Sequence, residues 1–467
     1  MVSEQEGTHE PVSKNGRSLK FRAFRAGSWV VTSHVVAQFL RLLGNLVMTR
    51  LLAPDAFGIM AIAMTVQGIV SLCADTGLRQ AIIQSPNGGK ASFLNTAWTL
   101  EILRSFFIWA ICLFIAIGLY AAGSLGWLPL GSVYSTPVLP AVIAVMSLSA
   151  VIQGLQSMNA ILAHRNLELY RLTLVELFSQ VVGLLVMGLL GWLTHSIWSF
   201  VAGGLLSIAL TTLLTHTWLH GPASRFQWDR KVLDELLHFG KWIWLSSTVG
   251  IIAGNGDRLL LGAWVNATVL GYYSIAVNLA GALDGLASRL FGSVSLPALS
   301  EVARSQPERL PGLYFRMRWV SDVAFIGLAG FLFASGQEII NLLYDVRYAP
   351  AGWMLQWLSF SLIFTRYGLV QNCYLALGRS HYLSAISATR LISVFILIPV
   401  SFYVFGLHAA IVAIAFIMAP STLLIFWFNQ KQGFNNFLLE IVTLGVWPIG
   451  WFVGYYFGAV VHAYIAH

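Results

Sequence analysis

The chain has 467 residues, of which 57% are hydrophobic and only 10% are charged, and its net charge is +8. This composition excludes a soluble protein of this size, because too few charged residues remain to cover its surface. Apolar runs of about 18 residues or more recur along the chain, which indicates a protein with many membrane-spanning helices.

The first 27 residues are polar and end in a basic stretch that contains Lys14, Arg17, Lys20, Arg22 and Arg25. No short apolar segment with a small-residue cleavage site precedes Trp29. We therefore expect no removed signal peptide, and we expect residues 1–27 to form a cytoplasmic tail.

Reading the apolar runs as helices predicts an all-α polytopic membrane protein. The predicted spans are 28–52, 56–74, 97–120, 138–160, 172–192, 196–219, 240–264, 269–294, 319–343, 352–377, 383–404 and 407–429. A last run, 438–463, is long enough for a further crossing but contains Pro448 and Gly450. The sequence therefore allows 12 spans or 13.

The basic residues predict the orientation in the membrane. With the N-terminus in the cytoplasm, most Lys and Arg residues fall on the cytoplasmic side, and only Arg50 and Arg347 fall at the outer side. This asymmetry follows the positive-inside rule. We expect a multi-pass protein of the cell inner membrane, with cytoplasmic loops at 220–241 and 289–318, and anionic lipid accounts for its positive charge without nucleic acid.

One segment of the chain occurs twice. Gly27–Gly68 aligns without a gap to Gly240–Gly281, 213 positions later, and nine of the 42 pairs are identical. The identical pairs include Gly58 with Gly271, and Gly68 with Gly281. Because six spans separate the copies, both halves face the same way. The sequence predicts two six-helix bundles, 28–219 and 240–429, joined by a cytoplasmic linker over 220–239 and related by a pseudo-twofold axis along the membrane normal.

Four motifs occur in a fixed order along the two halves. Gly256–Gly262 reads G-D-R-L-L-L-G, and Val269–Ala276 reads V-L-G-Y-Y-S-I-A. In the first half, Thr49–Gly58 lies at the predicted outer turn after the first span, and Asp75–Gln84 lies at the cytoplasmic end of the second span. Together these motifs resemble those of the Wzx-type polysaccharide flippases, of the colanic-acid or succinoglycan exporter type, in the multidrug/oligosaccharidyl-lipid/polysaccharide exporter superfamily.

This resemblance implies a fold like that of the MATE and MurJ transporters. It also implies a flippase that moves an undecaprenyl-diphosphate-linked oligosaccharide repeat unit from the cytoplasmic to the periplasmic leaflet by alternating access. Such units are used to assemble exopolysaccharide, capsule or O-antigen, so a polysaccharide polymerase and other export machinery are expected partners. No motif identifies the sugar, the coupling ion or the oligomeric state.

Arginines at membrane depth point independently to an anionic substrate. Each costs about 2.5–3.5 kcal/mol at the centre of a spanning helix unless it faces water or a partner. An arginine surplus suits a diphosphate, which the guanidinium group can bind through two parallel hydrogen bonds. The five arginines are Arg41, Arg104, Arg258, Arg366 and Arg390.

For two of the five arginines, the position at membrane depth has another explanation than substrate binding. Arg104 lies three residues after Glu101, which favours a local ion pair. Arg41 could extend to the outer interface. Arg366 and Arg390 have no close partner in the sequence. We predict that Arg41, Arg258, Arg366 and Arg390 bind the substrate.

Two acidic residues lie at comparable depth. Asp257 and Arg258 are adjacent, so they point about 100° apart on a helix and should contact different surroundings. Asp284 could carry a coupling proton or hold an arginine in place. We predict that Asp257 and Asp284 couple transport to an ion or lock a charge.

The remaining motifs exclude common catalytic sites. Cys73, Cys112 and Cys373 fall inside apolar runs, with no C-x-x-C motif or His cluster nearby, and they indicate small buried side chains. No phosphate-binding loop, nucleophile elbow, zinc pattern or paired carboxylates of a glycosidase occur. We therefore expect no metal, no cofactor and no enzymatic activity.

Two alternative functions remain at this point. A drug or metabolite:cation antiporter of the same superfamily would have acidic residues rather than arginines in its cavity. A membrane glycosyltransferase or polymerase would need a large loop with catalytic acids, which is longer than any hydrophilic loop here.

Overall fold

The computed structural model describes residues 19–74, 77–166 and 168–465, so most of the predicted N-terminal tail lies outside the described residues. The described part is built from helices and turns, with no β-strand. A helix satisfies its own backbone hydrogen bonds, which the hydrocarbon core of a membrane requires. The predicted all-α class is confirmed.

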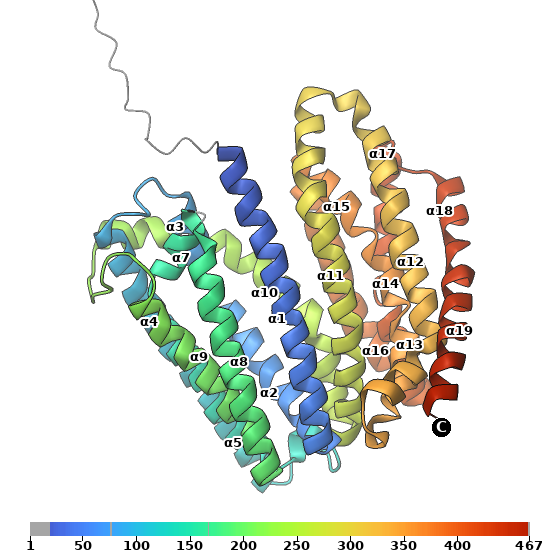
Figure 1. The fold of residues 1–467 in the computed structure, drawn as a ribbon, viewed down its shortest axis with the longest axis horizontal. Helices are drawn as coiled ribbons and strands as arrows, with labels where there is room; N and C mark the ends of the chain where they lie inside the picture. Colours follow the sequence, from blue (N-terminus) through green and yellow to red (C-terminus); the bar gives the residue numbers. More distant parts are fainter. Residues whose placement is uncertain (1–18, 75–76, 167, 466–467) are drawn as a thin grey trace, which may run out of the picture.

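The first half of the chain forms one group of helices. Its elements are α1 (Leu19–Leu51), α2 (Pro54–Cys73), α3 (Leu78–Gln84), α4 (Ala91–Ser124), η1 (Val133–Ser135), α5 (Leu139–Met146), α6 (Leu148–Gly154), α7 (Asn159–Arg165), α8 (Leu169–Thr194) and α9 (Trp198–Thr217). Figure 1 shows this group in blue and green, packed beside the second group.

The second half forms the other group. Its elements are α10 (Arg230–Trp264), α11 (Ala267–Ser305), η2 (Pro307–Arg309), α12 (Leu310–Leu343), η3 (Val346–Tyr348), α13 (Ala351–Leu358), α14 (Ser361–Thr365), α15 (Gly368–Ala376), α16 (Ser380–Ala415), α17 (Ala419–Gln432), α18 (Phe437–Leu444) and α19 (Val446–Ile465). The two groups lean apart at the end of the molecule where α1 begins and converge where α1 ends (Figure 1).

The described helices make this a multi-pass membrane protein. Seven helical stretches are long and apolar enough to cross a membrane, or eight if one bent pair counts as a span. One stretch, 381–432, has 52 residues and hence room for two crossings of a hydrocarbon core about 30 Å thick. With 33, 35 and 39 residues, α1, α10 and α11 are also long enough, but they carry charged side chains. The total of 12 or 13 spans stays a prediction.

Two predicted spans are interrupted, and a third break, inside α16, separates the predicted spans 383–404 and 407–429. Residues 138–160 form α5, α6 and the start of α7, with a 62° bend before α7. Residues 352–377 likewise form α13, α14 and α15. In α16 the break falls at Gly406, whose φ of 81° suits glycine, and not at Pro399 inside the same helix.

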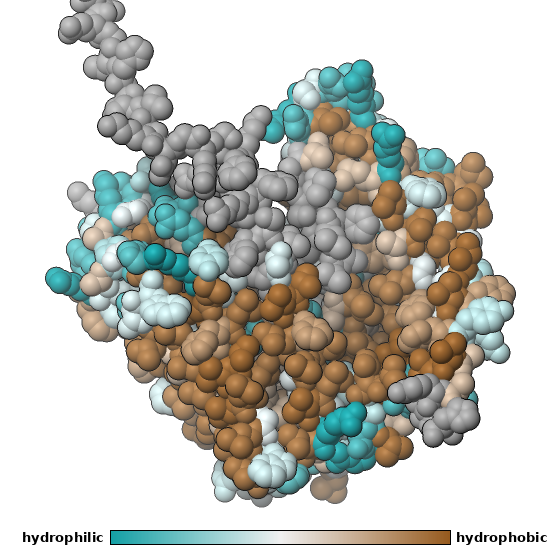
Figure 2. Space-filling model, in the orientation of Figure 1, coloured by the Kyte–Doolittle hydropathy of each residue, from teal (hydrophilic) through white to brown (hydrophobic). Residues whose placement is uncertain are grey.

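The surface agrees with a membrane setting. Figure 2 shows a broad hydrophobic band across the helices, with hydrophilic residues gathered at both ends. Large side chains such as Phe114 and Phe405, which are 78% and 76% exposed, lie on the outside of the molecule. An apolar surface of this extent faces lipid in a membrane protein.

The two copies of the repeat contact each other reciprocally. A Cβ atom on Gly58 would lie 1.9 Å from the carbonyl oxygen of Ala267, and one on Gly271 would lie 1.9 Å from that of Pro54. Pro54 and Ala267 are also equivalent positions of the repeat. Each glycine is the fifth residue of its helix, α2 or α11, where it lets the two helices cross backbone to backbone.

Candidate functional site

A cavity of about 590 Å³ lies between the two halves. It is bounded mainly by α1, α2, α8 and α9 of the first half and by α10 and α11 of the second. Its polar lining residues are Gln38, Arg41, Asn45, Ser149, Arg258, Asn278 and Tyr344. Apolar side chains, including Met60, Met64, Met146 and Met187, complete the wall. We call this space the central cavity.

Two predicted substrate ligands enter the central cavity from opposite halves. Arg41 lines it from α1, and Arg258 lines it from α10. Arg258 Nη2 donates to Asn278 Oδ1 of α11 at 3.3 Å, which orients the guanidinium group. The position of the repeat equivalent to Arg258 is Asn45, a neutral residue on the same cavity. The central cavity therefore offers positive charge together with neutral hydrogen-bonding groups.

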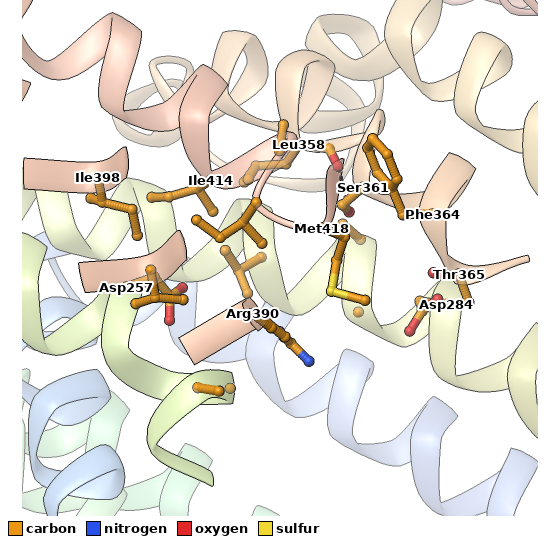
Figure 3. Close-up of a pocket in the computed structure, with 18 of the residues that line it drawn as sticks. Asp257, Asp284, Leu358, Ser361, Phe364, Thr365, Arg390, Ile398, Ile414 and Met418 are labelled. Carbon is orange, nitrogen blue, oxygen red and sulfur yellow. Dashed lines mark hydrogen bonds between the residues drawn. The ribbon is translucent and has the colours of Figure 1, made fainter. Parts of the chain in front are cut away.

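A second cavity of about 460 Å³ lies inside the second half. It brings together Asp257, Asp284 and Arg390 from α10, α11 and α16, and we call it the inner cavity. Figure 3 shows these side chains beneath apolar residues, with Thr365 beside Asp284. The hydroxyl of Tyr273 donates to the Asp257 carboxylate.

Charge in the inner cavity is incompletely paired. The guanidinium group of Arg390 and the carboxylates of Asp257 and Asp284 line the same cavity, so opposite charges share one space. Among the described residues, however, Arg390 Nε and Asp284 Oδ1 are buried without a hydrogen-bond partner. Such groups are costly unless a ligand, water or a changed conformation satisfies them. The inner cavity is therefore a candidate site for a change of charge.

The two cavities are neighbours. Val277 and Gly281 of α11 line both of them. Asp257 faces the inner cavity, and the adjacent Arg258 faces the central cavity, as their angular separation on one helix requires.

Arg366 lies elsewhere, in a buried cluster of charges. Its Nη1 donates to Asp322 Oδ2 at 3.2 Å, and its Nη2 donates to Glu440 Oε2 at 2.8 Å. Arg318 also pairs with both carboxylates. Arg366 is 4% exposed, and Arg318 is 2% exposed. The cluster therefore contains two positive and two negative side chains.

This cluster joins helices that are distant in the sequence. Arg318 and Asp322 lie on α12, and Glu440 lies on α18. Thr443 Oγ1, also on α18, donates to Asp322 Oδ2 at 3.2 Å. The ion pairs thus hold the C-terminal segment against the second half.

The predicted local ion pair of the first half is confirmed. Arg104 Nη2 contacts Glu101 Oε1 within α4, and both side chains are about four-fifths buried.

Comparison with known proteins places the chain in a family. The profile of the polysaccharide biosynthesis protein family matches residues 47–352. The chain belongs to this family. The resemblance inferred from the sequence motifs is thereby confirmed.

Three relatives of this polysaccharide biosynthesis protein show what it is similar to. An uncharacterized membrane protein in the cps region of Klebsiella pneumoniae is 24% identical over 71% of this chain and 66% of its own. The lipopolysaccharide biosynthesis protein WzxC of Escherichia coli (strain K12) is 20% identical over 69% of this chain and 63% of its own length. The succinoglycan biosynthesis transport protein ExoT of Rhizobium meliloti (strain 1021) is 22% identical over 74% and 66%. The match spans about two thirds of the length of these relatives.

Solved structures establish the fold. A structure of the lipid II flippase MurJ in an inward closed conformation has a TM-score of 0.69, with 12% identity, and covers 93% of this chain and 99% of that one. An inward-facing multidrug resistance MATE family transporter of the MOP superfamily has a TM-score of 0.64, with 16% identity, and covers 86% of this chain and 95% of that one. The expected MATE-like and MurJ-like fold is confirmed.

Sequence reasoning missed Arg318, Asp322 and Glu440 as members of the charge cluster. The spacing of Arg318 and Asp322, four residues apart on one helix, was an available signal. No local pattern connects Glu440 to them, since it lies 118 positions after Asp322.

Proposed function

We propose that this protein is a flippase for an undecaprenyl-diphosphate-linked oligosaccharide repeat unit. The observation that carries the proposal is the central cavity, which lies between the two halves and receives Arg41 and Arg258 from opposite sides. The names of the relatives support it, because they describe proteins of lipopolysaccharide and succinoglycan biosynthesis.

The chemistry of the central cavity fits such a substrate. A diphosphate loses its water shell when it leaves the cytoplasm, and the lost hydration must be replaced by positive charge or hydrogen-bond donors. The guanidinium groups of Arg41 and Arg258 supply the charge. Gln38, Asn45 and Asn278 offer amide groups for sugar hydroxyls, which need both donors and acceptors.

We propose a separate role for the inner cavity. Asp257 and Asp284 respond to a coupling ion or proton, and Arg390 is released toward the substrate when their charge changes. The unpartnered Arg390 Nε and Asp284 Oδ1 support this exchange. Arg366 was predicted as a fourth substrate ligand, and we propose instead that it stabilises the charge cluster.

A second candidate function follows from the same inner cavity. Two carboxylates in a pocket are also what a drug or metabolite:cation antiporter needs for a cationic substrate. The central cavity argues against this alternative, because both charged side chains named on its wall are arginines.

We further propose that the protein lies in the cell inner membrane with a cytoplasmic N-terminus, and that it supplies a polysaccharide polymerase with its transported substrate.

The test of the flippase function is complementation of a strain that lacks its own polysaccharide flippase. Restored surface polymer together with unchanged resistance to cationic drugs supports the flippase. Increased drug resistance without polymer supports the antiporter and overturns the proposal.

A further inference from the structure

The two halves are hydrogen-bonded to each other where they converge. At one contact, η3 of the second half meets the C-terminal end of α1. The buried hydroxyl of Tyr348 donates to the carbonyl oxygen of Leu52 at 2.9 Å. Arg347 Nη2 donates to the carbonyl oxygens of Thr49 and Arg50 at 3.3 and 3.1 Å. The last carbonyls of a helix lack partners within the helix, and a cation there is favourable.

At the second contact, the first half supplies the hydrogen-bond donors and the second half supplies the acceptors. Here η1 of the first half meets the C-terminal end of α10. The backbone N–H of Val133 donates to the carbonyl oxygen of Val265 at 3.1 Å. The hydroxyl of Tyr134 donates to the carbonyl oxygen of Leu259 at 2.9 Å.

These contacts join equivalent elements of the two halves, although the donor groups differ: Tyr348 corresponds to Ser135 in the repeat, and Tyr134 corresponds to Arg347. The 3-10 helices η1 and η3 are 213 positions apart, which is the offset of the repeat. Their acceptors Leu52 and Val265 are also 213 positions apart. Each half therefore uses the same element to bind the same helix end of the other half.

We propose that these two contacts are a duplicated latch that closes the outer exit of the central cavity and must open for the cargo to leave. The proposal rests on the proposed function for the identity of the cargo, and on the proposed cytoplasmic N-terminus for which side of the membrane is the outer one. Between the latches, the Gly58 and Gly271 crossing leaves no room between α2 and α11. The three contacts together seal the end of the molecule where the helix groups converge (Figure 1).

Charged residues at the same end reinforce one latch. Asp345 Oδ1 accepts hydrogen bonds from the backbone N–H and from Nε of Arg347, at 2.9 and 3.0 Å. These bonds lower the pKa of the Asp345 carboxyl, so it is ionised at neutral pH. Asp345 thereby orients the Arg347 side chain toward the α1 carbonyls.

The test measures the distance across the latch directly. Spin labels are placed at Leu130→Cys and Val346→Cys, which are 99% and 83% exposed on the outer segments of opposite halves. Cys73 is replaced by Ala, and the buried Cys112 and Cys373 are retained. Distances are then measured by pulsed electron paramagnetic resonance in full-length protein in lipid nanodiscs.

Tyr134→Phe and Tyr348→Phe each remove one hydroxyl that bridges the halves. Each loss should raise the ratio of the long-distance to the short-distance population by about fivefold, and both losses by about 25-fold. The matched control is Tyr374→Phe, because that hydroxyl donates to Asn429 Oδ1 at 2.6 Å within the second half. It should leave the distribution unchanged.

An unchanged distribution in the double variant overturns the latch, and so does a wild-type protein that already shows only the long distance. An equal shift in Tyr374→Phe also overturns it, because the effect would then not depend on bonds between the halves. The measurement requires no substrate. A failure of the flippase proposal would therefore appear in complementation while the distances still respond to the latch variants.

Discussion

Arg41 and Arg258 reach one cavity from different halves, so each can contribute separately to holding an anion. Replacing either by Ala should lower polymer export by about 10-fold or more, because a hydrogen bond to a charged group contributes about 1.5–3 kcal/mol. Lys should restore only part of the activity, since it lacks the planar fork. The measurement is surface polymer in a complemented strain.

Protein level in the membrane must be measured alongside. Arg171→Ala is the matched control, because Arg171 is exposed and contacts His220 outside both cavities. Full export by the Arg41→Ala, Arg258→Ala double variant would show that these arginines do not bind the substrate.

Arg366 should behave differently from Arg258. Removing it leaves Asp322 and Glu440 short of one positive partner in a buried site. Such a loss destabilises proteins by about 3–5 kcal/mol. We expect Arg366→Ala and Glu440→Gln to lower the melting temperature of the purified protein, whereas Arg258→Ala leaves it nearly unchanged. An Arg366→Ala protein of normal melting temperature that fails to export polymer would return Arg366 to the substrate site.

This contrast also shows how far the sequence could identify the site. Hydropathy placed Arg258, Arg366 and Arg390 in the membrane, and helix geometry separated Asp257 from Arg258. The sequence could not show that Arg366 differs in role from Arg258 and Arg390, because the carboxylates that pair with Arg366 lie 44 and 74 positions away. Pairing over such distances depends on how α12, α14 and α18 pack, and no local pattern encodes that packing.

At the scale of helices, the crossing of α2 and α11 depends on glycine. Gly58→Ala or Gly271→Ala would place a methyl group 1.9 Å from a carbonyl oxygen of the facing helix, so the helices must separate. We expect each substitution to weaken the packing of α2 on α11 by about 1–3 kcal/mol. Both substitutions should raise the outward-open population, and by similar amounts. The reactivity toward thiol reagents of a cysteine introduced at the outer end of the molecule measures that population.

Gly68→Ala is the matched control. Gly68 is also identical to its counterpart in the repeat, but a Cβ atom there would meet no other atom within 4 Å. If Gly68→Ala has the same effect as Gly58→Ala, the close crossing is not the cause.

The helices themselves were largely predictable, and their interruptions were not. Long apolar runs gave α2, α4, α8 and α9 with small differences at the ends. The divided spans α5–α7 and α13–α15 looked continuous, because their breaks contain residues such as Ser147, Leu155 and Ser359 that are common in helices. The two sets of breaks occur at nearly the same offset as the repeat, so the architecture of the halves imposes them.

At the scale of the whole molecule, the arrangement of basic residues predicts which end faces the cytoplasm. A cytoplasmic reporter should be active when fused at Ser224, and a periplasmic reporter should be active at Gly131. With 13 crossings, a fusion after His467 reports from the periplasm. Reversed activity at either internal site would contradict the orientation and would place the latch on the cytoplasmic side.

The proposed function of the protein is to move a lipid-linked oligosaccharide between leaflets. The direct measurement reconstitutes the purified protein in liposomes that contain undecaprenyl-diphosphate oligosaccharide and adds a membrane-impermeant glycosidase outside. With wild-type protein, we predict that cleavage proceeds beyond the outer-leaflet fraction toward all of the substrate, and that the Arg41→Ala, Arg258→Ala variant stops at that fraction. Cleavage by wild-type protein that also stops at the outer-leaflet fraction, under any imposed ion gradient, would contradict the claim.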